Sequence, residues 1–352
     1  MAYLRKTALL ALCLLAATAV IFAAGGGQAA GGSKAPASQP AKFPTKDITL
    51  IVPWNPGGSS DLIGRLLVAD MEKTLGVRIP VVNTPGATGT IGMTDCMNKP
   101  HDGYTLIANA TPHSHGVTGM APWKPSDWAY LAAYYVPGII AVNKNSPYKT
   151  IQELVTACGA KPDTVTGGTA GVGSSGYVNM EVLKSVIPEF KSYKHISYTG
   201  GAPAVTATLA GEVNFTPQLS NEMIDHLRAG TLIALAALTE EDLQLQGVPY
   251  VIPSIKKAYP AAAKVLPCGD AFGLMFPAGV PAETQKILEA AYLKACKTDA
   301  AKAFATEKGV ILRAMNLQES AALRDRDAKK VGWILFDSGA APNSPEKFGV
   351  TR

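Results

Sequence analysis

The sequence predicts an α/β protein of two lobes, each with a mostly parallel sheet flanked by helices, and a ligand cleft between them. The main observation is that strand and helix patterns alternate in two series, at residues 48–109 and 150–238. The length of 352 residues is enough for two medium domains that each bury a core. With 47% hydrophobic and 17% charged residues, the composition is that of a globular chain and excludes a largely disordered one.

The first 30 residues have the pattern of a secretory signal peptide. Arg5 and Lys6 precede an apolar run at 7–24, and small residues follow. An uncleaved membrane anchor is the alternative, but the alanine content and the small residues favour cleavage between residues 24 and 30. Cys13 lies inside the apolar run, which argues against a lipid anchor. We therefore expect a periplasmic protein.

The segment 31–44 is rich in Gly, Ser, Ala and Pro and lacks apolar periodicity, which predicts a flexible linker. Beyond it, short apolar runs bounded by Pro or Gly indicate strands, and apolar residues spaced by three or four indicate helices. In the first series these patterns predict strands at 48–52, 79–83 and 104–109 and helices at 60–75 and 91–97.

The second series predicts helices and strands in the same alternation. The expected helices are 150–157, 177–186, 202–210 and one ending at 228, and the expected strands are 164–167, 195–198, 213–216 and 232–238. The rest of the chain predicts a strand at 271–276 and helices at 282–296, 299–308 and 317–336, which return to the first lobe. The expected first lobe is therefore 45–142 with 239–352 and the second is 143–238, with hinges near 141–143 and after Leu238.

Charge and cysteine content exclude further classes. The formal net charge of +5 is small for this length, and Arg5 and Lys6 supply two of its charges, so no nucleic-acid partner is expected. Four cysteines remain after the signal peptide and allow three full pairings. They are Cys96, Cys158, Cys268 and Cys296. None has a metal-type spacing, so we expect buried thiols, with or without one structural bridge.

Glycine- and hydroxyl-rich loops follow three of the predicted strands and lead into helices, at 53–61, 85–90 and 169–176. Open parallel sheets bind ligands in loops at the carboxyl ends of their strands, and the unpaired N–H groups of a helix start can hold an anion. None of these loops contains Lys or Arg, so backbone N–H groups and hydroxyls would hold such a ligand. One loop of this kind is more often a turn and helix cap, but three at corresponding places favour a binding site.

Motifs of other functional classes are incomplete. Gly171, Gly173 and Gly176 match the GxGxxG pattern, but Tyr198 and Thr199 stand where a dinucleotide site has its acidic residue. The sequence contains no GxxxxGK[ST] and no GxSxG, which disfavours a P-loop NTPase and an α/β-hydrolase.

His113 and His115 form the one histidine pair of the sequence, on a predicted loop. They have no acidic or cysteine ligand near them in sequence. We therefore expect neither a metal nor a cofactor.

Six ordered motifs are distributed along the mature chain between residues 52 and 281. They are VPWNPGGSSD at 52–61, VNTPGATGTIG at 82–92, DGYTL at 102–106, TAGVGS at 169–174, YTGGAPA at 198–204 and FPAGVP at 276–281. They are similar to VPFPPGGSTD, ENRPGAGGxIG, PDGYTLL, TAGxGS, YKGxxPA and APAGTP. On these motifs the chain resembles the substrate-binding proteins of tripartite tricarboxylate transporters, also called the Bug or TctC family.

The resemblance implies a monomeric, periplasmic binding protein-like receptor that closes on a small carboxylate and delivers it to a membrane permease. In the family the first-strand loop and the TAGxGS loop grip a ligand carboxylate. The positions that match here are Asn55, Gly58, Ser59, Ser60, Thr169, Ser174 and Ser175, with backbone groups of Ala87 and Thr88, an apolar wall at Trp54, side contacts from Thr111 and His113, and the turn at Tyr198 and Thr199.

Two departures from the family pattern bear on the ligand. Thr199 stands where the family often has Lys, and Asn214 stands where it usually has Asp. Because these changes remove one positive and one negative side chain, the resemblance does not choose among dicarboxylates, citrate-like acids, amino acids and aromatic carboxylates.

Two alternative functions remain at this point. A sensor subunit that presents its closed form to a membrane kinase would use the same fold, and the sequence does not separate it from a transport receptor. An exported hydrolase using Ser59 or Ser175 would need a base within hydrogen-bond reach, and no motif supplies one. We therefore expect no enzyme activity.

Overall fold

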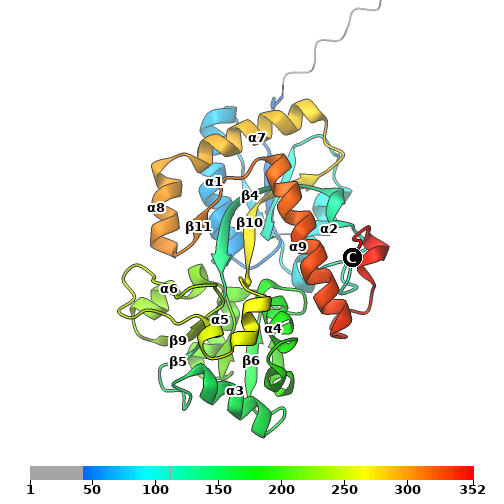
Figure 1. Cartoon of the computed structure of the whole chain (residues 1–352). Helices are drawn as coiled ribbons and strands as arrows, with labels where there is room; N and C mark the ends of the chain where they lie inside the picture. The colour runs from blue at the N-terminus through cyan, green and yellow to red at the C-terminus, as the bar shows by residue number, and fades with distance from the viewer. Residues whose placement is uncertain (1–42, 111) are drawn as a thin grey trace, which may run out of the picture. The chain divides into compact units, whose positions relative to one another are not determined.

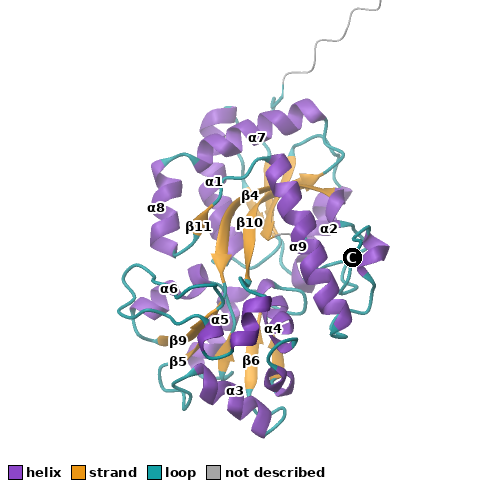
Figure 2. Ribbon diagram, in the orientation of Figure 1, coloured by secondary structure: helices purple, strands orange, loops and turns teal. Residues whose placement is uncertain are grey.

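The computed structural model describes residues 43–110 and 112–352. The predicted signal peptide, nearly all of the linker and the expected ligand residue Thr111 lie outside the described residues. The described chain forms a six-stranded and a five-stranded sheet with helices packed against them (Figure 1, Figure 2). This arrangement confirms the predicted two-lobed α/β fold.

The sheet of the first lobe contains β1 (Thr49–Val52), β2 (Val81–Asn83), β3 (Thr105–Ala110), β4 (Trp128–Pro137), β10 (Gly269–Pro277) and β11 (Ile311–Leu312). Its strand order is β11-β4-β10-β3-β1-β2. Strand β1 lies parallel to β2 and β3. Strand β10 runs antiparallel to β3 and β4, and β11 runs antiparallel to β4.

The sheet of the second lobe contains β5 (Ile139–Asn143), β6 (Thr166–Thr169), β7 (Lys194–Ser197), β8 (Phe215–Thr216) and β9 (Leu232–Ala237). Its strand order is β7-β6-β8-β5-β9. Strand β6 lies parallel to β7 and β8, whereas β5 runs antiparallel to β8 and β9.

Both sheets are mixed, which corrects the expectation of mostly parallel sheets. The antiparallel pairs involve β4 and β10 in one sheet and β5 and β9 in the other, the strands nearest to the points where the chain changes sheets. Strand β4 was not predicted, because it is buried almost throughout and its apolar sequence shows no alternation.

The helices agree closely with the sequence patterns. They are α1 (Ser59–Leu75), α2 (Thr90–Asn98), α3 (Ile151–Ala160), α4 (Ser175–Lys184), α5 (Gly201–Ala210), α6 (Ser220–Arg228), α7 (Ala282–Cys296), α8 (Asp299–Lys308) and α9 (Leu317–Asp337). Their ends follow local chemistry. Helix α1 ends at Gly76 in the left-handed conformation, and Asn316 and Glu319 form a capping box at the start of α9.

The chain crosses between the sheets at Gly138 and returns at Cys268–Gly269, whereas the sequence predicts the crossings at 142/143 and 238/239. The N–H of Gly138 donates to the Cys268 carbonyl over 3.0 Å, and the N–H of Leu238 donates to the Gly138 carbonyl over 2.9 Å. Residues 239–268 pack on the second lobe, since Leu245 and Ile252 belong to a core with β5, β9 and α6. The predicted lobe boundaries differ from the observed crossings because this segment is irregular, and irregular chain leaves no periodic signal in the sequence.

Each lobe has its own hydrophobic core. In the first lobe, Leu50 and Val52 of β1 pack with Ile63 of α1 and Tyr292 of α7. In the second lobe, Val142 of β5 packs with residues of α3 and α4 and with Phe215 of β8, and Leu335 of α9 belongs to the same core. Helix α9 therefore contacts both lobes, because it also packs against β4.

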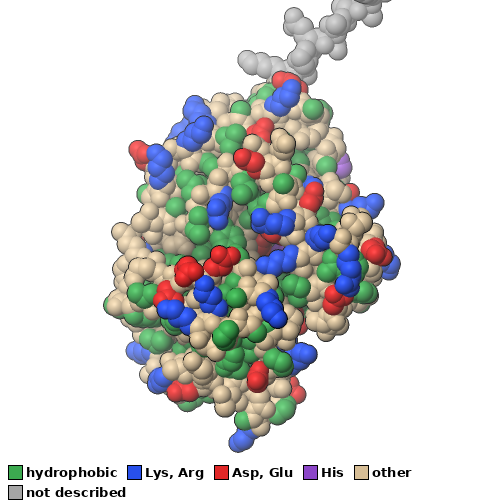
Figure 3. All heavy atoms as spheres, in the orientation of Figure 1, with side chains coloured by type: hydrophobic (Ala, Val, Ile, Leu, Met, Phe, Trp, Pro, Cys, Tyr) green, Lys and Arg blue, Asp and Glu red, His purple; other side chains and the backbone are tan. Residues whose placement is uncertain are grey.

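The cysteines, the helices and the surface charge can also be compared with the expectations from the sequence. Cys96, Cys158, Cys268 and Cys296 are all buried and free. Over residues 43–110 and 112–352, no helix combines the length and apolarity needed to cross a membrane. On the face shown in Figure 3, positive and negative side chains are interspersed over the surface.

Candidate functional site

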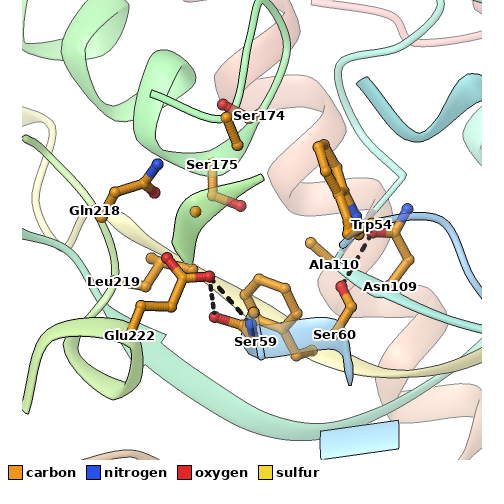
Figure 4. Close-up of a pocket in the computed structure, with 14 residues that line it drawn as sticks. Trp54, Ser59, Ser60, Asn109, Ala110, Ser174, Ser175, Gln218, Leu219 and Glu222 are labelled. Atoms are coloured by element: carbon orange, nitrogen blue, oxygen red, sulfur yellow. Dashed lines mark hydrogen bonds between the residues drawn. The ribbon is translucent and has the colours of Figure 1, made fainter. Parts of the chain in front are cut away.

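A small cavity of about 40 Å³ lies between the two lobes. Its walls come from α1 and β3 of the first lobe, from α4, α5 and α6 of the second, and from β10 (Figure 4). The lining residues are Trp54, Gly58, Ser59, Ser60, Asn109, Ala110, Ala170, Ser174, Ser175, Gly201, Gln218, Leu219, Glu222 and Phe272. The cavity thus brings together Trp54, Gly58, Ser59, Ser60, Ser174 and Ser175 from the predicted set.

The first glycine-rich loop ends at Ser59, the first residue of α1. The backbone N–H of Ser59 donates to Glu222 Oε1 over 3.0 Å, and its hydroxyl lies 3.0 Å from the same oxygen and 2.8 Å from Asn221 Oδ1. Glu222 belongs to α6 of the second lobe. The predicted anion position at the start of α1 is therefore occupied by a carboxylate of the protein itself.

Trp54 forms one wall of the cavity and is anchored by a neighbouring strand. Its indole N–H donates to Asn109 Oδ1 at the end of β3 over 2.8 Å, and the Ser60 hydroxyl lies 3.4 Å from the same oxygen. Asn109 is buried at 2% exposure. This contact sets the orientation of the apolar wall.

The third loop connects β6 to α4 and holds its serines differently. Ser174 is the N-cap of α4 and its side chain accepts from the N–H of Tyr177. The Ser175 hydroxyl donates to Asp270 Oδ2 over 2.8 Å. Thr169 does not line the cavity, because its hydroxyl lies 2.6 Å from His195 Nε2 and accepts from the N–H of Gly171. Thr169 therefore lies outside the cavity and holds the third loop in place through its bond with the Gly171 N–H.

The second loop contains Ala87 and Thr88, which both have positive φ angles, 45° and 52°. Neither residue lines the cavity. Thr88 lies beside the third loop instead, since a Cβ placed on Gly171 would come within 2.9 Å of Thr88 Oγ1. This loop therefore meets the opposite lobe at the rim of the site.

The turn at Tyr198 and Thr199 reaches the first loop directly. The Asn55 side-chain amide donates to Thr199 Oγ1 over 2.7 Å. Ser114 donates to the carbonyl of Gly173, which is a second contact between the lobes. These polar contacts join the loops of the two lobes around the cavity.

His113 was expected beside the ligand, but it lines a different and larger cavity of about 410 Å³. That cavity lies among β4, β10, α4 and α9 and includes Tyr135, Asn179, Asp270 and Arg326. Asp270 lies behind Ser175, so β10 separates the two cavities. The described residues contain no group of three or more metal-ligating side chains.

Electrostatics in the small cavity are dominated by one residue. Among the described residues that line it, none is Lys, Arg or His, and Glu222 is the single acidic side chain. Burial raises the pKa of the Glu222 carboxyl, although bonds from Ser59 oppose that rise. Burial likewise raises the pKa of Asp270, while His113 and Ser175 act in the opposite direction.

Several lining residues were missed by sequence analysis: Asn109, Ala110, Ala170, Gly201, Gln218, Leu219, Glu222 and Phe272. Glu222 and Gln218 follow β8, so the rule on loops after parallel strands applies to them as it did to the three glycine-rich loops. The sequence analysis did not identify them because the segment after β8 contains no glycine-rich loop. Phe272 lies within a strand, where no local signal marks it.

Two of the four serines that line the cavity contact a carboxylate, which the sequence did not predict. Ser59 lies 3.0 Å from Glu222, and Ser175 lies 2.8 Å from Asp270. The His195 ring contacts Thr169 rather than either serine. The geometry therefore offers hydrogen-bonding groups and helix N-termini for holding a small polar molecule.

Comparisons with known proteins place the chain among transport receptors. The family model described as tripartite tricarboxylate transporter family receptor matches residues 63–339. Protein BugT of Bordetella pertussis is 29% identical over 205 residues, which cover 56% of this chain and 62% of BugT, less than two thirds of that relative. A protein of the UPF0065 group from Bordetella bronchiseptica is 32% identical over 268 residues, which cover 72% of this chain and 74% of that protein.

A solved structure shares the fold. MatC (Rpa3494) from Rhodopseudomonas palustris, solved with bound malate, has a TM-score of 0.75 at 24% identity, covering 83% of this chain and 100% of MatC.

Proposed function

Since the chain belongs to the family of tripartite tricarboxylate transporter receptors, we propose that it is a periplasmic solute-binding protein that captures a small carboxylate between its lobes. It delivers this ligand to the membrane permease of such a transporter. In this proposal the N-terminal 30 residues direct export and are removed.

The observation that carries the proposal is the meeting of three helix starts at one cavity. Ser59 of α1, Ser175 of α4 and Gly201 of α5 are the first residues of their helices, and all three line it. Helix N-termini present N–H groups and a positive dipole end, which favour a negatively charged group. The starts of α1 and α5 face the Glu222 carboxylate, so the start of α4 is the one that we assign to the ligand carboxylate. MatC, which has the same fold, was solved with malate, a small dicarboxylate.

Closure around the ligand uses the crossing points as hinges. Gly138, Leu238 and Cys268 are held together by backbone hydrogen bonds at the junction between the sheets. The contacts from Asn55 to Thr199 and from Ser59 to Glu222 join opposite lobes. Rotation about the crossings separates these pairs and opens the site.

Receptor function is favoured over catalysis by the family. The pairing of Ser59 and Ser175 with carboxylates does not form a serine–histidine pair. In the proposed function both serines hold the closed site together, and no bond of the ligand is broken.

The test is a thermal-shift screen of the chain from residue 43 onward against aliphatic, hydroxylated, amino and aromatic mono-, di- and tricarboxylates, including malate. Each acid is paired with its neutral amide as the control. A ligand at about 100 times its Kd stabilises a protein by about 2.7 kcal/mol, so a binding carboxylate raises the melting temperature and its amide does not. The absence of a shift with every carboxylate would contradict the proposal.

Delivery is tested separately, by uptake of the identified ligand in host cells with and without the gene. Loss of uptake supports a transport receptor. Unchanged uptake with a lost transcriptional response would favour the sensor alternative.

A further inference from the structure

Glu222 is the most unusual group in the cavity. Its carboxylate lies between the first residues of α1 and α5: Oε1 receives the Ser59 N–H, and a Cβ on Gly201 would overlap the carboxylate. The protein therefore places its own negative charge where the glycine-rich loop alone would receive a ligand anion. A ligand carboxylate at this point would meet like charge.

Only one of the two carboxylate oxygens of Glu222 has a hydrogen-bond partner among the described residues. Oε2 is buried and has no hydrogen-bond partner among the described residues, whereas Oε1 receives the bonds from Ser59. A buried acceptor without a donor is costly, and the cost is larger for a charged one. The cavity thus contains an open position for a hydrogen-bond donor.

Gln218 provides a second polar atom without a partner in the described part of the chain, and this one is a hydrogen-bond donor. Gln218 lines the same cavity, is 2% exposed, and its Nε2 has no partner among the described residues. Figure 4 shows Gln218 and Glu222 on the same side of the cavity. Gln218 lies beside the first turn of α4, since a Cβ placed on Gly176 would come within 2.9 Å of Gln218 Oε1. An amide donor beside the start of α4 suits a carboxylate oxygen.

We propose that the ligand carries an ammonium group as well as its carboxylate, as amino acids do, and that Glu222 is the residue that selects the ammonium group. The ammonium group donates to Glu222 Oε2, and the carboxylate accepts from Gln218 Nε2 and from the N–H groups at the start of α4. This inference rests on the proposed carboxylate-binding function and narrows its substrate class.

Charge balance supports the assignment. The described lining residues contain no basic side chain, so the protein supplies no cation for Glu222 within the cavity. Burying one charge without a partner is unfavourable, and an opposite charge on the ligand offsets that penalty. A ligand with carboxylates only would leave two or more negative charges in the same small space.

The experiment is titration calorimetry with matched acids that differ by one amino group: propionate and alanine, succinate and aspartate, glutarate and glutamate. We expect the wild-type protein to bind at least one amino member more than 10-fold more tightly than its amine-free counterpart. Equal or tighter binding of the amine-free members would overturn this inference and leave the proposed function standing. Binding of neither series would overturn both.

The variant Glu222→Gln keeps the shape of the side chain and removes its charge. We expect it to lose at least 10-fold in affinity for the amino member while the amine-free member binds equally well or better. Glu240→Gln, an exposed change in the loop after β9, is the matched control and leaves the preference unchanged. An unchanged preference in Glu222→Gln would show that Glu222 does not select the ligand.

Discussion

The first and third glycine-rich loops have similar sequences but use their serines in different ways. In the first loop, Ser59 contacts a carboxylate of the opposite lobe, Glu222. In the third loop, Ser174 caps its own helix and Ser175 contacts Asp270 on the crossing strand β10. Both loops thus meet an internal carboxylate, but only Glu222 lines the small cavity.

The difference shows what a glycine- and serine-rich helix start predicts. The motif predicts a position that favours negative charge, because the N–H groups there have no partner in the helix. It does not say whether the charge belongs to a ligand or to the protein. In the first loop the protein itself fills the position, and the ligand is expected to interact with Glu222.

Acid is expected to weaken both lobes, through the buried His115 in the first and the half-buried His195 in the second. Burial lowers the pKa of His115, after β3, and of His195, on β7, to about 4, with nearby positive groups adding to the effect. In the unfolded chain a histidine has a pKa of about 6.5, so protons bind the unfolded chain first as the pH falls. Stability is therefore complete above about pH 6.5 and decreases toward pH 4, by about 3 kcal/mol through the buried His115 and by less through His195, because solvent screens its charge.

Urea unfolding at several pH values measures this loss. His195→Gln, which changes the support behind Thr169, is expected to flatten the pH dependence, and the exposed His101→Gln is not. An equal slope in wild type and His195→Gln would mean that the second lobe contributes nothing to acid sensitivity.

Replacing each serine separately sharpens the comparison of the loops. Ser174→Ala removes the cap of α4 and is expected to lower the free energy of unfolding by about 1 kcal/mol. Ser59→Ala removes one hydroxyl contact of Glu222, with a similar cost of about 1 kcal/mol, and also weakens ligand binding. Chemical denaturation and calorimetry on both variants distinguish a cap from a site residue.

The exposed Ser126→Ala serves as the control and is expected to change stability by less than about 0.5 kcal/mol. If Ser59→Ala bound ligand as tightly as the wild type, the Ser59 hydroxyl would have no part in ligand binding.

The smallest expected effect concerns the wall of the first loop. Trp54→Phe keeps an aromatic surface and loses the 2.8 Å bond to Asn109, so affinity is expected to fall by about 0.5 kcal/mol, or roughly 2-fold. Trp54→Ala removes the surface and is expected to affect ligands with an apolar body more than small polar ones. Calorimetry with alanine and with a larger aliphatic amino acid checks this, and equal losses for both would exclude a wall function.

The predicted elements match the structure best where periodicity is strong and local. Helices α7 and α8 have the predicted bounds, 282–296 and 299–308. Strand β4 was missed because its buried apolar residues do not alternate, and residues 239–268 were assigned to the wrong side of the crossing because irregular chain has no period. Local signals thus define elements better than they define which lobe an element joins.

The residues of the candidate site also differ in how well a local sequence signal predicts their position. Trp54, Ser59, Ser60, Ser174 and Ser175 carry a local signal, a glycine-rich loop between strand and helix, and all of them line the cavity. Thr169 lies in the third loop and His113 lies in the segment after β3, but both face other partners, because the side-chain direction depends on what packs behind the loop.

The sequence alone determined that helices would begin with serines after glycine-rich loops, since capping and backbone conformation are local properties. The tertiary structure decided whether the negative charge at such a helix start belongs to the protein or to a ligand. Glu222 contacts Ser59 across 163 positions of the chain, and only the packing of α6 against the opposite lobe brings them together. The polarity of the cavity, and with it the ligand class that we propose, therefore depends on the fold.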